Sequence, residues 1–126
     1  MKLFPVLLAA CFVLMVGSAQ ALDIAPYSSA KLAEAKLAGK ATALHFHANW
    51  CPTCRAQQKV INELRADKSL PVTIFVVDYD SEEALREKLK VRTQSTLIVY
   101  KGKDEKARIA GEIAPAKIRA ALQAAL

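Results

Sequence analysis

Apolar residues along this chain gather into short runs that predict strands. Ala41–Ala48 is a strand candidate with apolar residues at Ala43, Leu44 and Phe46. Val72–Val77 is rich in β-branched and aromatic residues, which favour a buried strand. Thr96–Tyr100 has the same character. The residues Lys101–Asp104 after it predict a hairpin turn, with Lys106–Ala110 as the returning antiparallel strand. The pattern therefore predicts four strands.

The segments around these runs have the spacing of helices. One helix is predicted to follow Cys51, and its apolar residues Val60, Ile61 and Leu64 fall on one face. The other helices are predicted at Ala30–Ala38, Glu82–Lys90 and Ala116–Ala125. Strands separated by helices are expected to form parallel units, to which the final hairpin adds an antiparallel edge. This order predicts an α/β fold with a central mixed sheet of about four to five strands flanked by helices on both faces.

The first 21 residues have the pattern of a secretory signal peptide. Lys2 supplies a short positive region, Leu3–Val16 is almost wholly apolar, and small residues suited to signal peptidase follow up to Ala21. We therefore expect residues 1–21 to be removed and residues 22–126 to form one domain. An uncleaved membrane anchor is the alternative, although the apolar run is short for a membrane span.

A second alternative for the N-terminus is lipid attachment at Cys11. Leu8–Cys11 resembles a bacterial lipobox, but the apolar run continues to Val16, whereas a lipobox normally ends such a run. Cleavage after residue 21 would remove Cys11 and leave only Cys51 and Cys54. An even pair of cysteines in an exported protein suits an oxidising compartment.

The charge of the chain is basic but evenly distributed. The sequence has 18 Lys and Arg residues against 12 Asp and Glu residues, a formal net charge of +6. The lysines are spread along the chain, and no aromatic residues are interleaved with a basic run. This distribution indicates a solvated surface and gives no indication of nucleic-acid binding.

The segment Trp50–Arg55 carries the clearest chemistry. Two residues separate Cys51 from Cys54, and the pair lies after a predicted strand and at the start of a predicted helix. A helix N-terminus offers free N–H groups and a partial positive charge, which favour a thiolate. Cys51 is therefore the predicted reactive thiol, and Cys54, one turn further in, the more buried resolving thiol. A static disulfide closing so small a loop would stabilise a fold little.

Three segments together resemble the thioredoxin family: Phe46–Arg55, Ser95–Gly102, and Gly111 before the last helix. The resemblance covers essentially all of residues 22–126. It implies a thioredoxin fold and the activity of a protein thiol–disulfide oxidoreductase. It also implies that Trp50 flanks the reactive disulfide.

The resemblance implies further properties of the site and its partners. The substrate-facing residues would be Trp50, Pro52, Thr53, Ser95 and Thr96. The cysteine pair would carry the electrons, so no organic cofactor is expected. Substrates would be disulfide-containing proteins of the periplasm, and a membrane thiol-transporting protein would supply electrons. We favour reduction over the reverse reaction, dithiol oxidation, since the periplasmic oxidants usually carry an inserted helical domain that this chain has no room for.

Three residues depart from the family pattern. Ser95 stands where a cis-proline normally faces the disulfide, so the Gln94–Ser95 bond is expected to be trans, because a non-proline cis bond costs about 3 kcal/mol. His45 stands where thioredoxins have a buried acid, and Val76 where thioredoxin itself has a lysine near that acid. Joint loss of both charges avoids leaving one of them buried and unpaired.

The two histidines have open alternatives. His45 is a candidate proton relay for Cys54, because its ordinary pKa is near neutrality, or else a core histidine held by hydrogen bonds. His47 is two residues from His45 in the same predicted strand, so both histidines are expected on the same face of the sheet. A histidine with Cys51 and Cys54 could bind zinc or copper, which makes a metal-binding or metal-delivery module the competing function. No metal site is predicted, because no clear fourth ligand is present.

Overall fold

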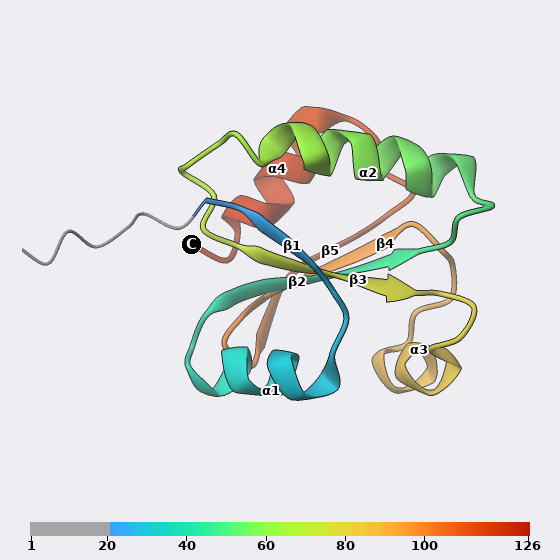
Figure 1. Ribbon diagram of the computed structural model, residues 1–126, viewed down its shortest axis with the longest axis horizontal. Coiled ribbons are helices and arrows are strands. Elements are labelled where there is room, and N and C mark those ends of the chain that lie inside the picture. Colours follow the sequence, from blue (N-terminus) through green and yellow to red (C-terminus); the bar gives the residue numbers. More distant parts are fainter. Residues whose placement is uncertain (1–20) are drawn as a thin grey trace, which may run out of the picture.

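The fold is described by a computed structural model that places residues 21–126 (Figure 1). The alternative lipid site at Cys11 and all but the last residue of the predicted signal peptide lie in residues 1–20, outside the described residues. The elements in chain order are β1 (Asp23–Pro26), α1 (Ser29–Leu37), β2 (Ala41–His47), α2 (Pro52–Leu64), β3 (Thr73–Asp78), α3 (Glu83–Leu89), β4 (Thr96–Lys101), β5 (Asp104–Ala110) and α4 (Pro115–Gln123). Within residues 21–126, no helix is both long and apolar enough to cross a membrane.

The strands form one mixed sheet in the order β1-β3-β2-β4-β5. β1 and β2 run parallel to β3, β4 runs antiparallel to β2, and β5 runs antiparallel to β4. The sheet has helices on both faces, which confirms the predicted fold class: α2 and α4 cover one face, and α1 and α3 lie on the other (Figure 1).

The expectation that all strands separated by helices run parallel is wrong for β4. A parallel return needs a helix that travels back along the whole strand. α3 has 7 residues, about 10 Å at the helical rise, whereas β3 has 6 residues, about 20 Å at the strand rise. The chain therefore enters β4 near the end of the sheet where β3 finishes, with Phe46 opposite Thr96.

The sequence pattern missed the edge strand β1. Its four residues pair with Thr73–Val76 of β3 in parallel register, but both of its ends are exposed and it includes Asp23 and Pro26. Backbone hydrogen bonding, rather than a run of apolar side chains, defines this strand. With β1 the sheet has five strands, within the predicted number.

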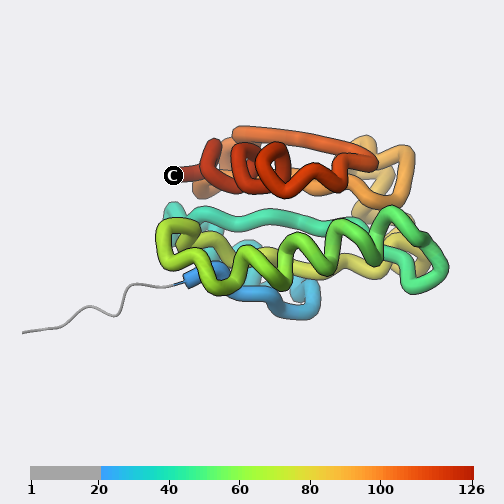
Figure 2. The backbone as a smooth tube through the Cα atoms, turned by 90° about the horizontal axis from the view of Figure 1, so that it is seen from above, coloured from blue at the N-terminus to red at the C-terminus, as the bar shows by residue number. Residues whose placement is uncertain are grey.

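The core lies in two layers separated by the sheet. On the α2 and α4 face it includes Ala43, Ile74, Val99, Ile61, Ile118 and Leu122. On the α1 and α3 face it includes Leu44, Phe46, Phe75, Ile98 and Leu32. Side chains therefore alternate between layers along β2, whose first six residues are all buried. Figure 2 shows α2 and α4 side by side over the sheet.

We expect Leu122→Ala to lower the free energy of unfolding by about 2–5 kcal/mol, because it leaves a cavity in a packed core. Leu122 is completely buried between α4 and the sheet. Leu37→Ala is the matched control, since Leu37 is also a helical leucine but is 75% exposed, and it should change stability by about 0.5 kcal/mol or less. Urea denaturation followed by circular dichroism measures both. Equal effects would contradict this account of the core.

Candidate active site: a cysteine pair beside a serine

Cys51 is the residue that caps the N-terminus of α2. β2 ends at His47, the backbone N–H of Cys51 donates to the carbonyl of Ala48 at 3.1 Å, and the helix begins at Pro52. Proline suits this first position, because its missing N–H would have no partner in the helix. The Cys51 Sγ accepts a hydrogen bond from the backbone N–H of Cys54 at 3.1 Å. The sulfur thus takes the place that a side-chain oxygen has in an ordinary cap.

The two thiols differ in acidity. Burial raises the pKa of Cys51, but hydrogen bonds from Cys54, from Ser95 and from the backbone outweigh it, so this pKa lies below its ordinary value. Burial also raises the pKa of Cys54, as does its hydrogen bond to Cys51, and this pKa stays above its ordinary value. In the reduced pair the negative charge therefore resides on Cys51.

Both cysteines are reduced and buried. Cys51 is 2% exposed and Cys54 is 0% exposed. Cys54 is the more buried of the two, but the difference is small and neither sulfur is open to solvent. The two side chains form a small cluster with Ala48 and the ring of Tyr79.

The side chain of Ser95 contacts both sulfurs. Its Oγ lies 3.3 Å from Cys51 Sγ and 3.1 Å from Cys54 Sγ, and the residue is 3% exposed. These distances fit hydrogen bonds to sulfur. Ser95 is therefore part of the reactive centre rather than only a neighbour of it.

The backbone holds Ser95 in an unusual conformation. Its φ of 66° lies in the left-handed region, which residues other than glycine seldom adopt. Its N–H donates to the carbonyl of Phe46 at 2.9 Å, and its carbonyl accepts from the N–H of Gly111 at 3.0 Å and from Gln57 Nε2 at 2.9 Å. All peptide bonds of the described residues, Gln94–Ser95 included, are trans.

The residues expected at a substrate surface separate into two groups. Pro52 is exposed and Thr53 is half-buried, next to the cysteines in the chain. Ser95 and Thr96 are buried, and the Thr96 hydroxyl donates to the carbonyl of Thr93 at 2.8 Å. In this state the side chains of Ser95 and Thr96 thus face the interior.

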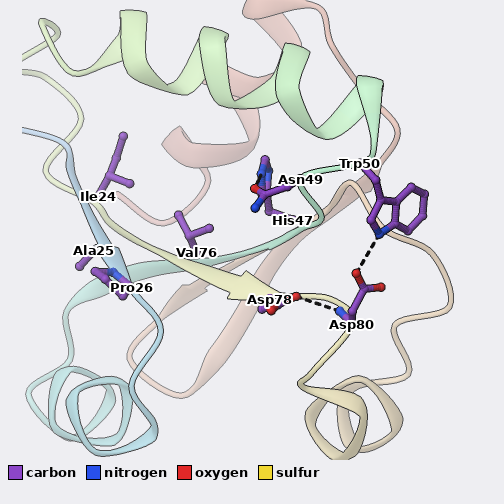
Figure 3. A pocket seen from close by; sticks show the side chains of 9 residues that line it. All are labelled: Ile24, Ala25, Pro26, His47, Asn49, Trp50, Val76, Asp78 and Asp80. Carbon is purple, nitrogen blue, oxygen red and sulfur yellow. Dashed lines mark hydrogen bonds between the residues drawn. The ribbon is translucent and has the colours of Figure 1, made fainter.

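Trp50 is 58% exposed, and its Nε1 donates to Asp80 Oδ2 at 2.8 Å. The indole borders a groove of about 520 Å³ between β1, β3 and the loop that joins β2 to α2 (Figure 3). The groove is lined by Ile24, Ala25, Pro26, Val76, His47, Asn49, Trp50, Asp78 and Asp80. Val76, which replaces the lysine of the family pattern, thus faces this groove.

His45 is fully buried and hydrogen-bonded to Gln57 of α2. Its Nε2 lies 2.9 Å from Gln57 Oε1, while Gln57 Nε2 donates to the carbonyls of Ser95 and Glu112, both at 2.9 Å. Carbonyl oxygens only accept hydrogen bonds, so the end of the Gln57 amide that faces the Ser95 and Glu112 carbonyls must be the NH₂ group. The Gln57 Oε1 therefore accepts, and His45 donates to it from Nε2. The Nδ1 of His45 is then an unprotonated nitrogen, and it has no hydrogen-bond partner.

Burial lowers the pKa of His45 to about 4, although the hydrogen bond to Gln57 opposes this shift. A neutral imidazole with so low a pKa is a weak base for the Cys54 thiol, whose own pKa is raised. The hydrogen bond to Gln57 and the lowered pKa of His45 together favour the core-histidine interpretation. The proton relay stays a prediction.

His47 lies next to His45 on the same sheet face, with ring centroids 5.6 Å apart and an edge-to-face arrangement. Its Nε2 lies 3.2 Å from Asn49 Oδ1, and it borders the groove beside Trp50. Among residues 21–126, no three His, Cys, Asp or Glu side chains come close enough together to hold a metal ion. A site made of Cys51, Cys54 and a histidine is therefore not assembled in this arrangement.

Sequence reasoning missed Gln57. It is 1% exposed, although it is polar. The signal was present, because Gln57 follows Cys54 by three residues and therefore shares its buried helix face. A glutamine on such a face needs hydrogen-bond partners in the interior.

A five-stranded mixed sheet with a Cys-x-x-Cys pair capping the helix after its central strand defines a thioredoxin-like dithiol protein. The sequence matches the family described as "Thioredoxin" over residues 28–124, so the chain belongs to the thioredoxin family. It is 33% identical to "Thioredoxin H-type" of Brassica oleracea over 81 residues, which cover 64% of this chain and 65% of the relative. The match thus spans less than two thirds of that relative's length.

Solved structures give the same family. "Trxlp" from Edwardsiella tarda superposes with a TM-score of 0.75 and 31% identity, covering 79% of this chain and 98% of that chain. Thioredoxin O2 from Arabidopsis thaliana in its oxidised state superposes with a TM-score of 0.65 and 26% identity, covering 82% of this chain and 93% of that chain.

His45 is expected to make the protein less stable in mild acid. In the unfolded chain its pKa is about 6.5, whereas burial holds it at about 4 in the fold. As the pH falls between these values the unfolded state binds the proton first, so the free energy of unfolding decreases, by about 3 kcal/mol once the pH is below 4.

The control is His45→Leu, measured by urea denaturation from pH 7.5 to 4. This variant should be less stable at neutral pH, because Gln57 loses a partner, but its stability should depend less on pH. Hydrogen bonds lower the pKa values of Asp67, Glu105 and Glu112, so these groups also make stability depend on pH in acid. Both proteins contain them, so their contribution cancels when the two pH curves are subtracted. Parallel pH curves would contradict the assignment to His45.

Proposed function

We propose that this protein is a thiol–disulfide oxidoreductase that reduces disulfide bonds of other proteins through Cys51 and Cys54. The observation that carries the proposal is the position of the Cys51 sulfur at the N-terminus of α2, where it accepts a hydrogen bond from the backbone N–H of Cys54 and contacts the Ser95 hydroxyl. These contacts lower the pKa of Cys51, whereas the pKa of Cys54 is raised. A nucleophile with a lowered pKa beside a protonated partner is what two-step disulfide exchange requires. Membership of the thioredoxin family supports the same activity.

The reaction needs only the two cysteines. The Cys51 thiolate attacks one sulfur of the substrate disulfide, that S–S bond breaks, and the first substrate thiolate leaves and takes a proton from water. Cys54 then gives up its proton and attacks Cys51 Sγ. The mixed disulfide breaks, and the second substrate thiolate leaves and takes up a proton in place of the one that Cys54 gave up. The substrate gains two electrons and two protons, the Cys51–Cys54 disulfide remains, and no cofactor takes part.

Substrates are proposed to dock around the exposed part of the site. Trp50 and Pro52 are exposed beside the nearly buried Cys51, and Trp50 is fixed by its hydrogen bond to Asp80. A rigid indole next to the nucleophile gives a disulfide-containing protein an apolar contact surface. Thr53, Ser95 and Thr96 are less accessible than Trp50, so their contact with a substrate requires that the substrate reach into the site.

The proposed compartment is the periplasm. The N-terminal pattern that ends at Ala21 supports export. A reductase in an oxidising compartment must be reduced again after each turnover, and for this step we propose a membrane protein that transports thiol equivalents. Dithiol oxidation uses the same two residues in reverse and is the alternative.

The reduction potential of Cys51–Cys54 distinguishes a reductase from an oxidant. For a reductase we expect a value of about −270 mV, as in thioredoxin, whereas a value of about −120 mV would make the protein an oxidant. The purified protein is equilibrated with mixtures of reduced and oxidised dithiol of known potential. It is then alkylated and its oxidised fraction is measured by mass spectrometry.

The roles of the two cysteines are tested by single substitutions. Cys54→Ser should accumulate a stable mixed disulfide with a substrate, because the attacking thiol remains and the resolving thiol is gone. Cys51→Ser should form no such adduct and should lose disulfide reductase activity by at least about a hundredfold. Each variant is incubated with oxidised insulin, and the adduct is measured by mass spectrometry of samples prepared without a reductant. An adduct in Cys51→Ser but not in Cys54→Ser would reverse the assignment.

A further inference from the structure

The hydroxyl of Ser95 has one hydrogen and two sulfurs within reach. It lies 3.3 Å from Cys51 Sγ and 3.1 Å from Cys54 Sγ. A serine hydroxyl donates one hydrogen bond and can accept others. It can therefore donate to only one of the two sulfurs at a time.

The charge moves between these sulfurs during disulfide exchange. Before the attack the thiolate is on Cys51. Once the mixed disulfide has formed, the Cys51 sulfur is neutral, and the next thiolate must form on Cys54. Both sulfurs are almost completely shielded from water. A thiolate on either of them can therefore receive a hydrogen bond only from a group of the protein. A hydrogen bond to a charged group is stronger than one between neutral groups.

We propose that Ser95 is a catalytic residue whose hydroxyl donates to the Cys51 thiolate before the attack and then turns to donate to the Cys54 thiolate during resolution. The inference rests on the proposed function, since it assumes that Cys51 attacks and Cys54 resolves. The hydrogen bond from Ser95 lowers the free energy of the thiolate on Cys51 and then that of the thiolate on Cys54. It takes no proton itself, so the bonds and electrons balance as in the two steps above.

The backbone around Ser95 supports this role. Three hydrogen bonds, with Phe46, Gly111 and Gln57, hold its N–H and carbonyl in place, so the hydroxyl can turn without movement of the loop. The left-handed backbone conformation has an energetic cost. A proline at this position has no hydroxyl or backbone N–H, so neither the sulfur contact nor the bond to Phe46 would form.

The test uses Ser95→Gly and Ser95→Ala. Both variants lack the hydroxyl, but glycine accepts the positive φ without strain, whereas alanine keeps the strain of the left-handed backbone. An effect of the hydroxyl must therefore appear in both. Thr42→Val is the matched control. Thr42 is a fully buried residue of β2 whose hydroxyl has no hydrogen-bond partner, and valine has nearly the same shape.

The reduced protein is mixed with the aromatic disulfide 5,5′-dithiobis(2-nitrobenzoate) in a stopped-flow instrument. Attack by Cys51 releases the first coloured thiolate at a rate proportional to the reagent concentration. Resolution by Cys54 releases the second at a rate independent of it. The pH dependence of thiolate absorbance at 240 nm gives the pKa of Cys51 separately.

We expect both Ser95 variants to resolve the mixed disulfide about tenfold more slowly than the unchanged protein, as for loss of one hydrogen bond to a charged group. We also expect the pKa of Cys51 to rise by about one unit. Thr42→Val should change neither. A merely structural role of Ser95 would not raise the Cys51 pKa in both variants.

Two results would overturn the inference: resolution at the unchanged rate in either Ser95 variant, or an unchanged Cys51 pKa in either one. Failure of the proposed function would look different. In that case the unchanged protein itself would release no first thiolate, or would release it without the second.

Discussion

The arrangement of the site depends on one buried amide, that of Gln57. Its Oε1 accepts from His45 in β2, and its Nε2 donates to the carbonyls of Ser95 before β4 and Glu112 before α4. A single side chain of α2 is thus bonded to three other segments of the fold. An unsatisfied buried amide costs more than its hydrogen bonds contribute, so these segments must stay together for the amide to be tolerated.

The chemistry of the cysteines follows from this constraint. Gln57 holds the carbonyl of Ser95, the backbone bond to Phe46 holds its N–H, and the hydroxyl is left pointing at the two sulfurs. Hydrogen bonds from the Cys54 thiol, from this hydroxyl and from the backbone at the start of α2 stabilise Cys51 as a thiolate, whereas burial and the bond to Cys51 keep Cys54 protonated. The unequal acidity of the pair therefore depends on how α2 and the loop before β4 are bonded together as well as on the Cys-x-x-Cys spacing.

Features that depend on local composition could be predicted from the sequence. The central strands, the amphipathic helix α2 and the cysteine pair at its start all have local signals, namely apolar runs, helical spacing and a Cys-x-x-Cys motif. The direction of β4 and the edge strand β1 depend on loop reach and backbone pairing, which leave no side-chain pattern. The contact between the Ser95 hydroxyl and both sulfurs was also missed. It requires a left-handed backbone that Phe46, Gly111 and Gln57 maintain, and these residues are distant from Ser95 in the sequence.

The departures from the family pattern have a common physical consequence. Where the family pattern has a buried acid and a lysine, this protein has His45, neutral because its pKa is about 4, and Val76, which lines the groove beside Trp50. No ionised group then lies under the cysteines at these two positions, and long-range charge from them cannot set the acidity of the thiols. Hydrogen bonds in direct contact with the sulfurs must do so instead. The replacement of a proline by Ser95 supplies one such donor, so the loss of the buried charges and the gain of the hydroxyl form one consistent change in how the thiolates are stabilised.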